Sequence, residues 1–359
     1  MAVSVPLESP PVAKPAPIFD IESLIDGHMR AAVDFLDGPA PMLAGMGRYH
    51  LGWVDGALRD VPPGSIDQGK RVRPGVALLC CAAVGGEAAV AAPLGAAIEL
   101  LHNFTLVHDD IQDHSPTRRH RPTVWTLWGS SQAINAGDAL FAAAHLALFR
   151  LLACGHDAAT VLRVAEAFER MTIDIVAGQV LDLSFEAESS VSTEAYLAMI
   201  DGKTAAIVTF AAWAGALLGG SGDARADLFG EFGRALGLGF QIQDDLLGVW
   251  GKREETGKEP ADDIRRKKKS LPVLMLREKA DASDRAVIDG LYRGDEVDAA
   301  GVRTMLSLLD AYGVRGDVEA RVRFHHDAAI QALTVAAPKP GFARSALLAR
   351  VESLASRSR

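Results

Sequence analysis

The chain has 359 residues, of which 49% are hydrophobic and 23% charged, so it holds enough apolar material to bury a large core. Its net charge of -9 argues against general nucleic-acid binding, because affinity for a phosphate backbone depends on clustered Lys and Arg. The three cysteines have no CxxC spacing, which indicates neither a disulfide framework nor a zinc site and fits a cytoplasmic location.

The N-terminal segment MAVSVPLESPPVAKPAP, residues 1–17, is rich in proline and has no helical period. This composition predicts a disordered tail. Two interpretations of the tail stay open: an inert extension, or a docking segment for an unknown partner.

From Ile18 onward, apolar residues recur every three to four positions, which predicts helices over 21–36, 160–178, 227–249 and 343–357. Strand signals are scarce, and breaks fall at DVPPGS and AAPKPG. We therefore expect an all-α fold, with one large helical domain over residues 18–359 and a central cavity between facing helices. The longest apolar run, from Ala205, is shorter than the roughly 20 residues of a bilayer crossing, so no integral membrane segment is expected.

The segment DQGKRVRP, residues 67–74, groups Lys70, Arg71 and Arg73 before a proline that can begin a helix. Free backbone amides at a helix start favour anions. Taken alone, this segment fits a solvated loop as well as a phosphate site.

A first acidic cluster ends the apolar helical run LLHNFTLVHDDIQD, residues 100–113. Asp109 and Asp113 lie one helical turn apart, and Asp110 falls within the same arc of about 100°. A lone DDxxD is usually a solvated helix end, but here an apolar helix precedes it and Arg118 and Arg119 follow it. These features favour a partly buried acidic site, in which like charges need compensation.

A second acidic cluster, Asp244 and Asp245, ends another apolar run, with Gln241 one turn earlier on the same face. Basic residues follow here too: Lys258 and the run Lys267, Lys268 and Lys269. Diphosphate bridged by Mg²⁺ is the chemistry that needs this pattern, because carboxylates hold the metal while Arg and Lys neutralise phosphate oxygens.

With these motifs in order, the chain resembles the polyprenyl synthetase family, the trans-isoprenyl diphosphate synthases that make farnesyl and geranylgeranyl diphosphates. The matching segments span nearly the whole body after the tail: GKRVRP, LLHNFTLVHDDIQD, RRHRPT, AGDAL, GQVLDL, GKT, GFQIQDD, GK and KKKSLP. The resemblance implies an Mg²⁺-dependent prenyltransferase with three ions per active site, and a homodimer. The resemblance further implies that the enzyme condenses isopentenyl diphosphate with an allylic diphosphate after Mg²⁺-assisted ionisation of the allylic substrate.

The resemblance also implies roles for individual residues. The metal ligands and their supports would be Asp109, Asp110, Asp113, Asp244 and Asp245. Isopentenyl diphosphate would be held by Lys70, Arg73, His102 and Arg119, and the allylic diphosphate by Arg118, Lys203 and Lys258, with Lys268 approaching from a closing loop. The catalytic residues would be Arg118, which holds the leaving diphosphate, and Lys203, Thr204 and Gln241, which steady the allylic cation.

Three positions depart from the family pattern. Gly248 stands where many members carry a third aspartate in the second motif, His120 replaces the usual glycine of RRGxPT, and Trp125 stands where His is common. Because the first aspartate of the second motif is the main direct ligand in the family, we expect activity to survive the change at position 248. The simplest interpretation of His120 is an exposed loop residue.

Product length is predicted from the helix before the first motif, along which the growing chain runs in the family. Phe104 lies about 7.5 Å, and Leu101 about 12 Å, deeper along the axis than Asp109. Only the fifth position before the motif is aromatic, and Thr105 leaves room beside it, which resembles the geranylgeranyl (C20) pattern. Farnesyl diphosphate (C15) is the alternative product, and ordinary core packing away from the channel is the alternative interpretation of Phe104.

Two other function classes were weighed. A class I terpene cyclase shares the helical fold and the first motif, but the second motif here lacks the Asn/Ser/Glu triad of cyclases. A non-catalytic partner subunit usually loses one aspartate motif, whereas this chain keeps both. The sequence therefore favours the chain-elongating enzyme.

Overall fold

The computed structural model describes residues 20–356 except 39, 63, 189, 252–259 and 294–295, with side chains as far as residue 353. The predicted tail 1–17 and Lys258 lie outside the described residues. Within the described part the fold is all-helical apart from one hairpin, as predicted, and the four predicted helices are present.

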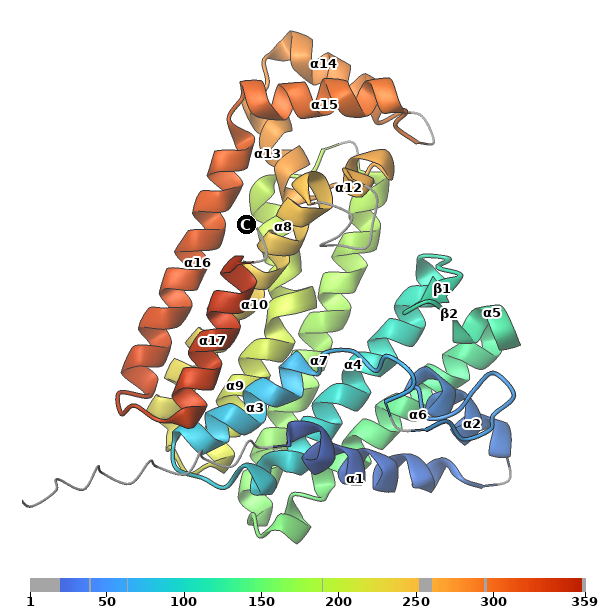
Figure 1. Ribbon diagram of the computed structural model, residues 1–359, viewed down its shortest axis with the longest axis vertical. Helices are drawn as coiled ribbons and strands as arrows, with labels where there is room; N and C mark the ends of the chain where they lie inside the picture. Colours follow the sequence, from blue (N-terminus) through green and yellow to red (C-terminus); the bar gives the residue numbers. More distant parts are fainter. Residues whose placement is uncertain are drawn as a thin grey trace, which may run out of the picture.

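The helices are α1 (Ile21–Val33), α2 (Pro41–His50), α3 (Val72–Ala83), α4 (Ala92–Gln112), α5 (Val124–Trp128), α6 (Ser130–Phe149), α7 (Ala158–Ala187), α8 (Thr193–Ile200), α9 (Ala206–Leu218), α10 (Asp223–Trp250), α12 (Asp262–Arg265), α13 (Leu271–Lys279), α14 (Ala282–Leu291), α15 (Ala299–Ala311), α16 (Val314–Ala336) and α17 (Phe342–Ser356). Strands β1 (Thr117–Arg118) and β2 (Arg121–Pro122) pair antiparallel. Figure 1 shows the long helices α7, α10 and α16 running along the molecule, with α14 and α15 at one end.

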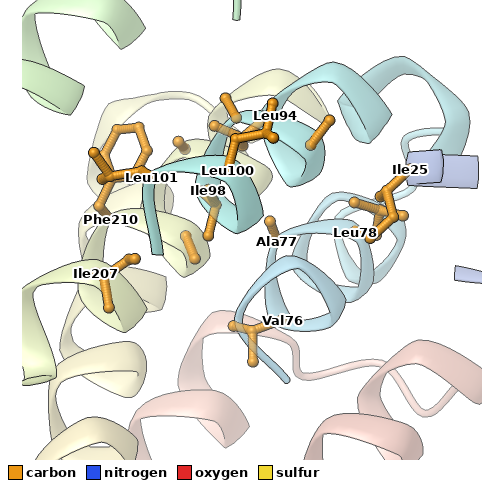
Figure 2. Packing of buried hydrophobic residues seen from close by; sticks show 14 of the residues in the cluster. Ile25, Val76, Ala77, Leu78, Leu94, Ile98, Leu100, Leu101, Ile207 and Phe210 are labelled. Atoms are coloured by element: carbon orange, nitrogen blue, oxygen red, sulfur yellow. The ribbon is translucent and has the colours of Figure 1, made fainter. Parts of the chain in front are cut away.

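Two hydrophobic clusters hold the helices together. The larger joins α1, α3, α4, α6, α7 and α9, and Figure 2 shows Ala77, Leu101 and Phe210 gathered in it from α3, α4 and α9. The smaller joins α8, α10, α13, α15 and α16. Because α10 contributes to both clusters, the second acidic motif near its C-terminal end is fixed to both halves of the molecule.

Three helical stretches are long and apolar enough to cross a membrane by length and composition: Ala88–Gln112, Ser130–Cys154 and Thr193–Leu218. The expectation of no membrane segment rested on the run from Ala205 alone, which begins within the third stretch. The most apolar windows of the three are 78%, 44% and 50% buried inside the molecule. The first of these stretches also carries Asp109, and the third carries Lys203 and Thr204, so both serve to place site residues.

Glycines allow the closest helix contacts. A Cβ on Gly215 of α9 would lie 2.1 Å from the backbone oxygen of Ala77 on α3, and one on Gly178 of α7 would lie 2.4 Å from the backbone nitrogen of Lys203. Neither neighbour can yield by rotating a side chain, because both are main-chain atoms. These two glycines therefore set the spacing of the helices that carry the site.

We predict that Gly215→Ala lowers the free energy of unfolding by roughly 2–3 kcal/mol, since an overpacked methyl forces α3 and α9 apart. The matched control is Gly27→Ala on α1, where a Cβ meets nothing within 4 Å and should stabilise the helix by about 0.5–1 kcal/mol. Urea unfolding measures both. Equal effects of the two substitutions would contradict the close-packing argument.

Candidate active site

The basic residues before α3 and on the hairpin meet at one pocket. Arg73 Nη1 donates to His102 Nε2 on α4 at 3.1 Å. A Cβ on Gly69 would lie 2.6 Å from Arg119 Nη2, so the guanidinium packs directly over this glycine. Gly69 also has a φ of +85°, a conformation that favours glycine. Arg73 and Arg119 thus both lie near His102, whereas Lys70 is exposed.

This pocket also contains a buried histidine and a buried glutamate that the sequence did not identify. His50 of α2 has a buried Nε2 without a hydrogen-bond partner, and burial together with Arg119, Arg118 and Arg121 lowers the pKa of His50 to about 3. Burial, assisted by Arg73 and Arg119, also holds the pKa of His102 well below its usual range. The two imidazoles are therefore neutral at pH 7, and the positive charge comes from arginines, with Glu99 buried beside them.

The hairpin contains His120, which replaces the usual glycine of the family pattern. Arg119 and His120 are its two central residues and have φ values of +51° and +61°. Positive φ at both central residues is the geometry of a type I′ turn, which glycine adopts most easily. His120 is exposed, in agreement with the predicted loop position. Trp125 donates from Nε1 to Ser115 O at 2.8 Å, so it fastens α5 to the loop after the first motif.

The first acidic motif lies at the C-terminal end of α4. Asp110 is 2% exposed, its Oδ1 accepts from Arg118 Nε at 2.8 Å, and its buried Oδ2 has no hydrogen-bond partner. Burial raises the pKa of Asp110 to about 6, against the opposing effect of Arg118. Burial also raises the pKa of Asp109, which lies near Lys203 and Asp113. Asp113 itself is exposed.

Lys203 and Thr204 lie in a π-helical turn, Asp201–Ala205, between α8 and α9. π-turns of this kind occur often at functional sites. Lys203 Nζ forms an ion pair with Asp182 of α7, a residue to which the sequence analysis gave no role. Its segment GQVLDL was part of the resemblance, so the motif was the signal available for finding it.

The second acidic motif is organised around Asp245, which is fully buried. Its carboxylate accepts three hydrogen bonds: from Tyr196 Oη at 2.6 Å, from Leu271 N at 3.0 Å and from Gln241 Nε2 at 3.1 Å. Thr204 Oγ1 in turn donates to Gln241 Oε1 at 3.0 Å. Burial raises the pKa of Asp245 to about 6. Asp244, by contrast, is exposed.

Lys268 lies at the second acidic motif, with Asp182 of α7 also nearby. Burial lowers its pKa, but Asp263, Asp245, Asp244 and Asp182 together raise it above the usual value. Lys268 therefore stays protonated at neutral pH, next to carboxylates of α7, α10 and α12.

The three predicted chain-length residues, Leu101, Phe104 and Thr105, lie in different environments. Leu101 is fully buried in the larger core cluster. The Phe104 ring packs against Phe141 of α6, with ring centroids 5.0 Å apart, and against His108. Thr105 lies one turn before Asp109 on the same helix face, and its Oγ1 donates to His102 O at 2.8 Å.

The acidic residues suit magnesium by their chemistry, because carboxylate oxygens are its preferred protein ligands. Burial raises the pKa of Asp109, and Asp113 and Asp182 raise it further while Lys203 and Arg118 lower it, so a bound cation would favour its charged form. Among the described residues no three acidic, His or Cys side chains converge closely enough to hold a metal alone. Such a site fits Mg²⁺ bound by one or two carboxylates, water and phosphate oxygens.

The fold and site together define an all-helical protein with two acidic motifs and an arginine pocket. The model of the polyprenyl synthetase family matches residues 62–309, so the chain belongs to this family and is a trans-isoprenyl diphosphate synthase. The chain is 41% identical over 250 residues to the (2E,6E)-farnesyl diphosphate synthase of Mycobacterium tuberculosis H37Rv, covering 70% of this chain and 67% of that protein.

Two further similarities support the same family. The geranylgeranyl diphosphate synthase of the same organism is 39% identical over 246 residues, covering 68% of this chain and 67% of that protein. The crystal structure of a polyprenyl synthetase from Streptomyces coelicolor matches with a TM-score of 0.81 at 34% identity, covering 93% of this chain and 97% of that one. They support the predicted family and fold and leave chain length open.

Proposed function

We propose that this prenyltransferase condenses isopentenyl diphosphate with an allylic diphosphate and that geranylgeranyl diphosphate is its product. The observation that carries the reaction is an acidic cluster with its own lysine at the end of each helix: Asp109 of α4 lies near Lys203, and Asp244 of α10 lies near Lys268. Asp182 of α7 is close to both lysines. The arginine pocket of Arg73, Arg119 and His102 would hold isopentenyl diphosphate, separate from this acidic region.

The chain's own residues have distinct parts in this reaction. Asp109, Asp113 and Asp244 would hold magnesium, with three ions expected. When bound, magnesium supplies Lewis-acid stabilisation of the departing allylic diphosphate. Arg118, Lys203 and Lys268 would neutralise the same leaving group, with Lys258 joining them. The oxygens of Thr204 and Gln241, which are hydrogen-bonded to each other, would face the allylic cation.

Metal dependence tests the proposal. We expect EDTA to abolish turnover, and Asp109→Ala and Asp244→Ala each to reduce kcat by about 100-fold or more, as loss of a leaving-group stabiliser does. Incorporation of isopentenyl diphosphate is measured with each allylic substrate in turn. The control is Asp310→Ala at an exposed position of α15. Full activity in EDTA, or loss of activity only through unfolding, would refute the mechanism.

In the same assay Arg73→Ala should raise KM for isopentenyl diphosphate more than the allylic KM.

Product length is proposed from Thr105 and Phe104. Thr105 shares the helix face of Asp109, so Thr105→Phe should block the channel and shift the product toward C15. Phe104 packs against α6, and Phe104→Ala should open space and lengthen the product past C20. Chromatography of the dephosphorylated products measures both. Unchanged distributions in both variants would remove these residues from the channel floor. Farnesyl diphosphate remains the second candidate product, since a farnesyl synthase is 41% identical.

We also propose a homodimer, through one face of α6 and α7. Large apolar side chains on these two helices are between 45% and 68% exposed: Ile134, Phe149, Leu162, Ile173, Val176 and Val180. An apolar surface of this kind is typical of a protein interface.

Light scattering should give a molar mass of twice 38.1 kDa. Ile173→Glu should lower that mass, while Phe324→Glu on α16, an equally exposed position, should not. A monomeric parent chain would contradict the proposal.

A further inference from the structure

The hairpin that carries Arg119 has a strained backbone. Its two central residues, Arg119 and His120, have φ values of +51° and +61°. Residues with a Cβ crowd the neighbouring backbone in this left-handed region, so such a turn persists only where surrounding contacts hold it. The contacts that hold the hairpin therefore decide where the Arg119 side chain lies.

Arg121, the residue after the turn, fastens the hairpin to α2 and the loop that follows α2. Its Nη1 donates to the backbone oxygen of Tyr49 at 3.0 Å, and its Nη2 donates to that of Val54 at 2.9 Å. The guanidinium also stacks on the Tyr49 ring, 4.0 Å from the ring centroid. Tyr49 Oη in turn donates to Pro122 O at 2.8 Å. Both residues of β2 are thus tied to the same place.

The residues to which Arg121 is tied are well packed. Tyr49 is 4% exposed and Val54 is 3% exposed. The Tyr49 ring meets the Trp128 ring of α5 edge to face, with centroids 5.1 Å apart, and Val54 forms an antiparallel bridge with Asp60. Because this anchor is held from several sides, Arg121 fixes the hairpin and does not merely follow it.

The hairpin places Arg119 at the arginine pocket. The Arg119 guanidinium packs over Gly69, and Arg119 lies close to His102 and Glu99. Both Nη atoms of Arg121, by contrast, are engaged by backbone oxygens of Tyr49 and Val54. Any effect of Arg121 on the pocket therefore passes through Arg119.

We infer that Arg121 is a positioning residue for isopentenyl diphosphate, because its clamp on Tyr49 and Val54 holds the strained turn that presents Arg119. The inference rests on the proposed function, in which the arginine pocket takes this substrate. The clamp also compensates for His120, which replaces the usual glycine of the motif. A turn with glycine at position 120 would depend on the clamp less, since glycine adopts positive φ without strain.

Calorimetric titration of isopentenyl diphosphate in EDTA, without allylic substrate, tests the inference apart from turnover. Arg121→Gln should raise Kd by about 10-fold, because a displaced Arg119 loses a hydrogen bond to a charged group. Arg121→Lys should recover only part of this loss, since an ammonium cannot replace the planar fork. The matched control is Arg48→Gln on the same helix α2. Arg48 pairs with Asp34 and Asp37, and its loss should leave Kd unchanged.

A double-mutant cycle tests the compensation for His120. His120→Gly alone should keep Kd within about 2-fold of the parent value, because the turn retains its shape. In His120→Gly/Arg121→Gln, Kd should rise by only about 3-fold, a coupling that two independent residues would not show. Tyr49→Phe removes one neutral hydrogen bond, keeps the stacked ring and should raise Kd by about 3-fold.

Turnover with both substrates gives a second measurement. Arg121→Gln should raise KM for isopentenyl diphosphate by about 10-fold, with a smaller change in the allylic KM and in kcat. Equal changes in the two KM values would contradict a role confined to the arginine pocket.

Three further outcomes would overturn the inference. Arg121 is only structural if its variants and Tyr49→Phe unfold at lower temperature yet keep the parent's Kd. The compensation is wrong if the double variant folds but binds no better than Arg121→Gln. If the parent chain and Arg48→Gln both fail to bind isopentenyl diphosphate, the proposed function itself fails, and that result is distinct from the other two.

Discussion

Carboxylates carried into the protein interior at the ends of apolar helices are the constraint on which this structure depends. A buried charge is costly unless it is paired and hydrogen-bonded. Asp245 meets that need with donors from α8, α10 and the start of α13, whereas Arg118 satisfies only one oxygen of Asp110. The hydrogen bonds that satisfy these carboxylates also hold the basic loops in place, so the acidic and basic halves of the site are assembled by one set of contacts.

The fold and the outline of the site were predictable because both are encoded locally. A three-to-four-residue apolar period identifies α1, α7, α10 and α17 without knowledge of their partners. The same period places Gln241 and Asp245 one turn apart, where they are hydrogen-bonded at 3.1 Å. The pairing of Arg73 with His102 followed from the order of motifs in the family and not from the spacing of the residues themselves.

Residues whose role depends on distant contacts escaped the sequence analysis. Tyr196 reaches Asp245 across 49 positions, and Asp263 fills the space beside Gly248 only because α12 folds back onto α10. Nothing in the local sequence of His50 indicates an imidazole enclosed by arginines. The Phe104 ring was expected along the product channel, but its contacts with Phe141 depend on how α4 is rotated against α6, and helical period alone does not fix that rotation.

The π-helical turn at Asp201–Ala205 also limits how the gene for this protein can change. Such a turn accommodates one residue more than a regular helix would, so α8 and α9 are out of phase with each other. Deleting a single codon there would restore a continuous α-helix and rotate everything beyond it by about 100° relative to α8. Lys203 and the packing face of α9 would then require incompatible registers. The segment is therefore constrained in length as well as in composition, because Gly202 within it has no room for a Cβ beside the backbone oxygen of Asp174.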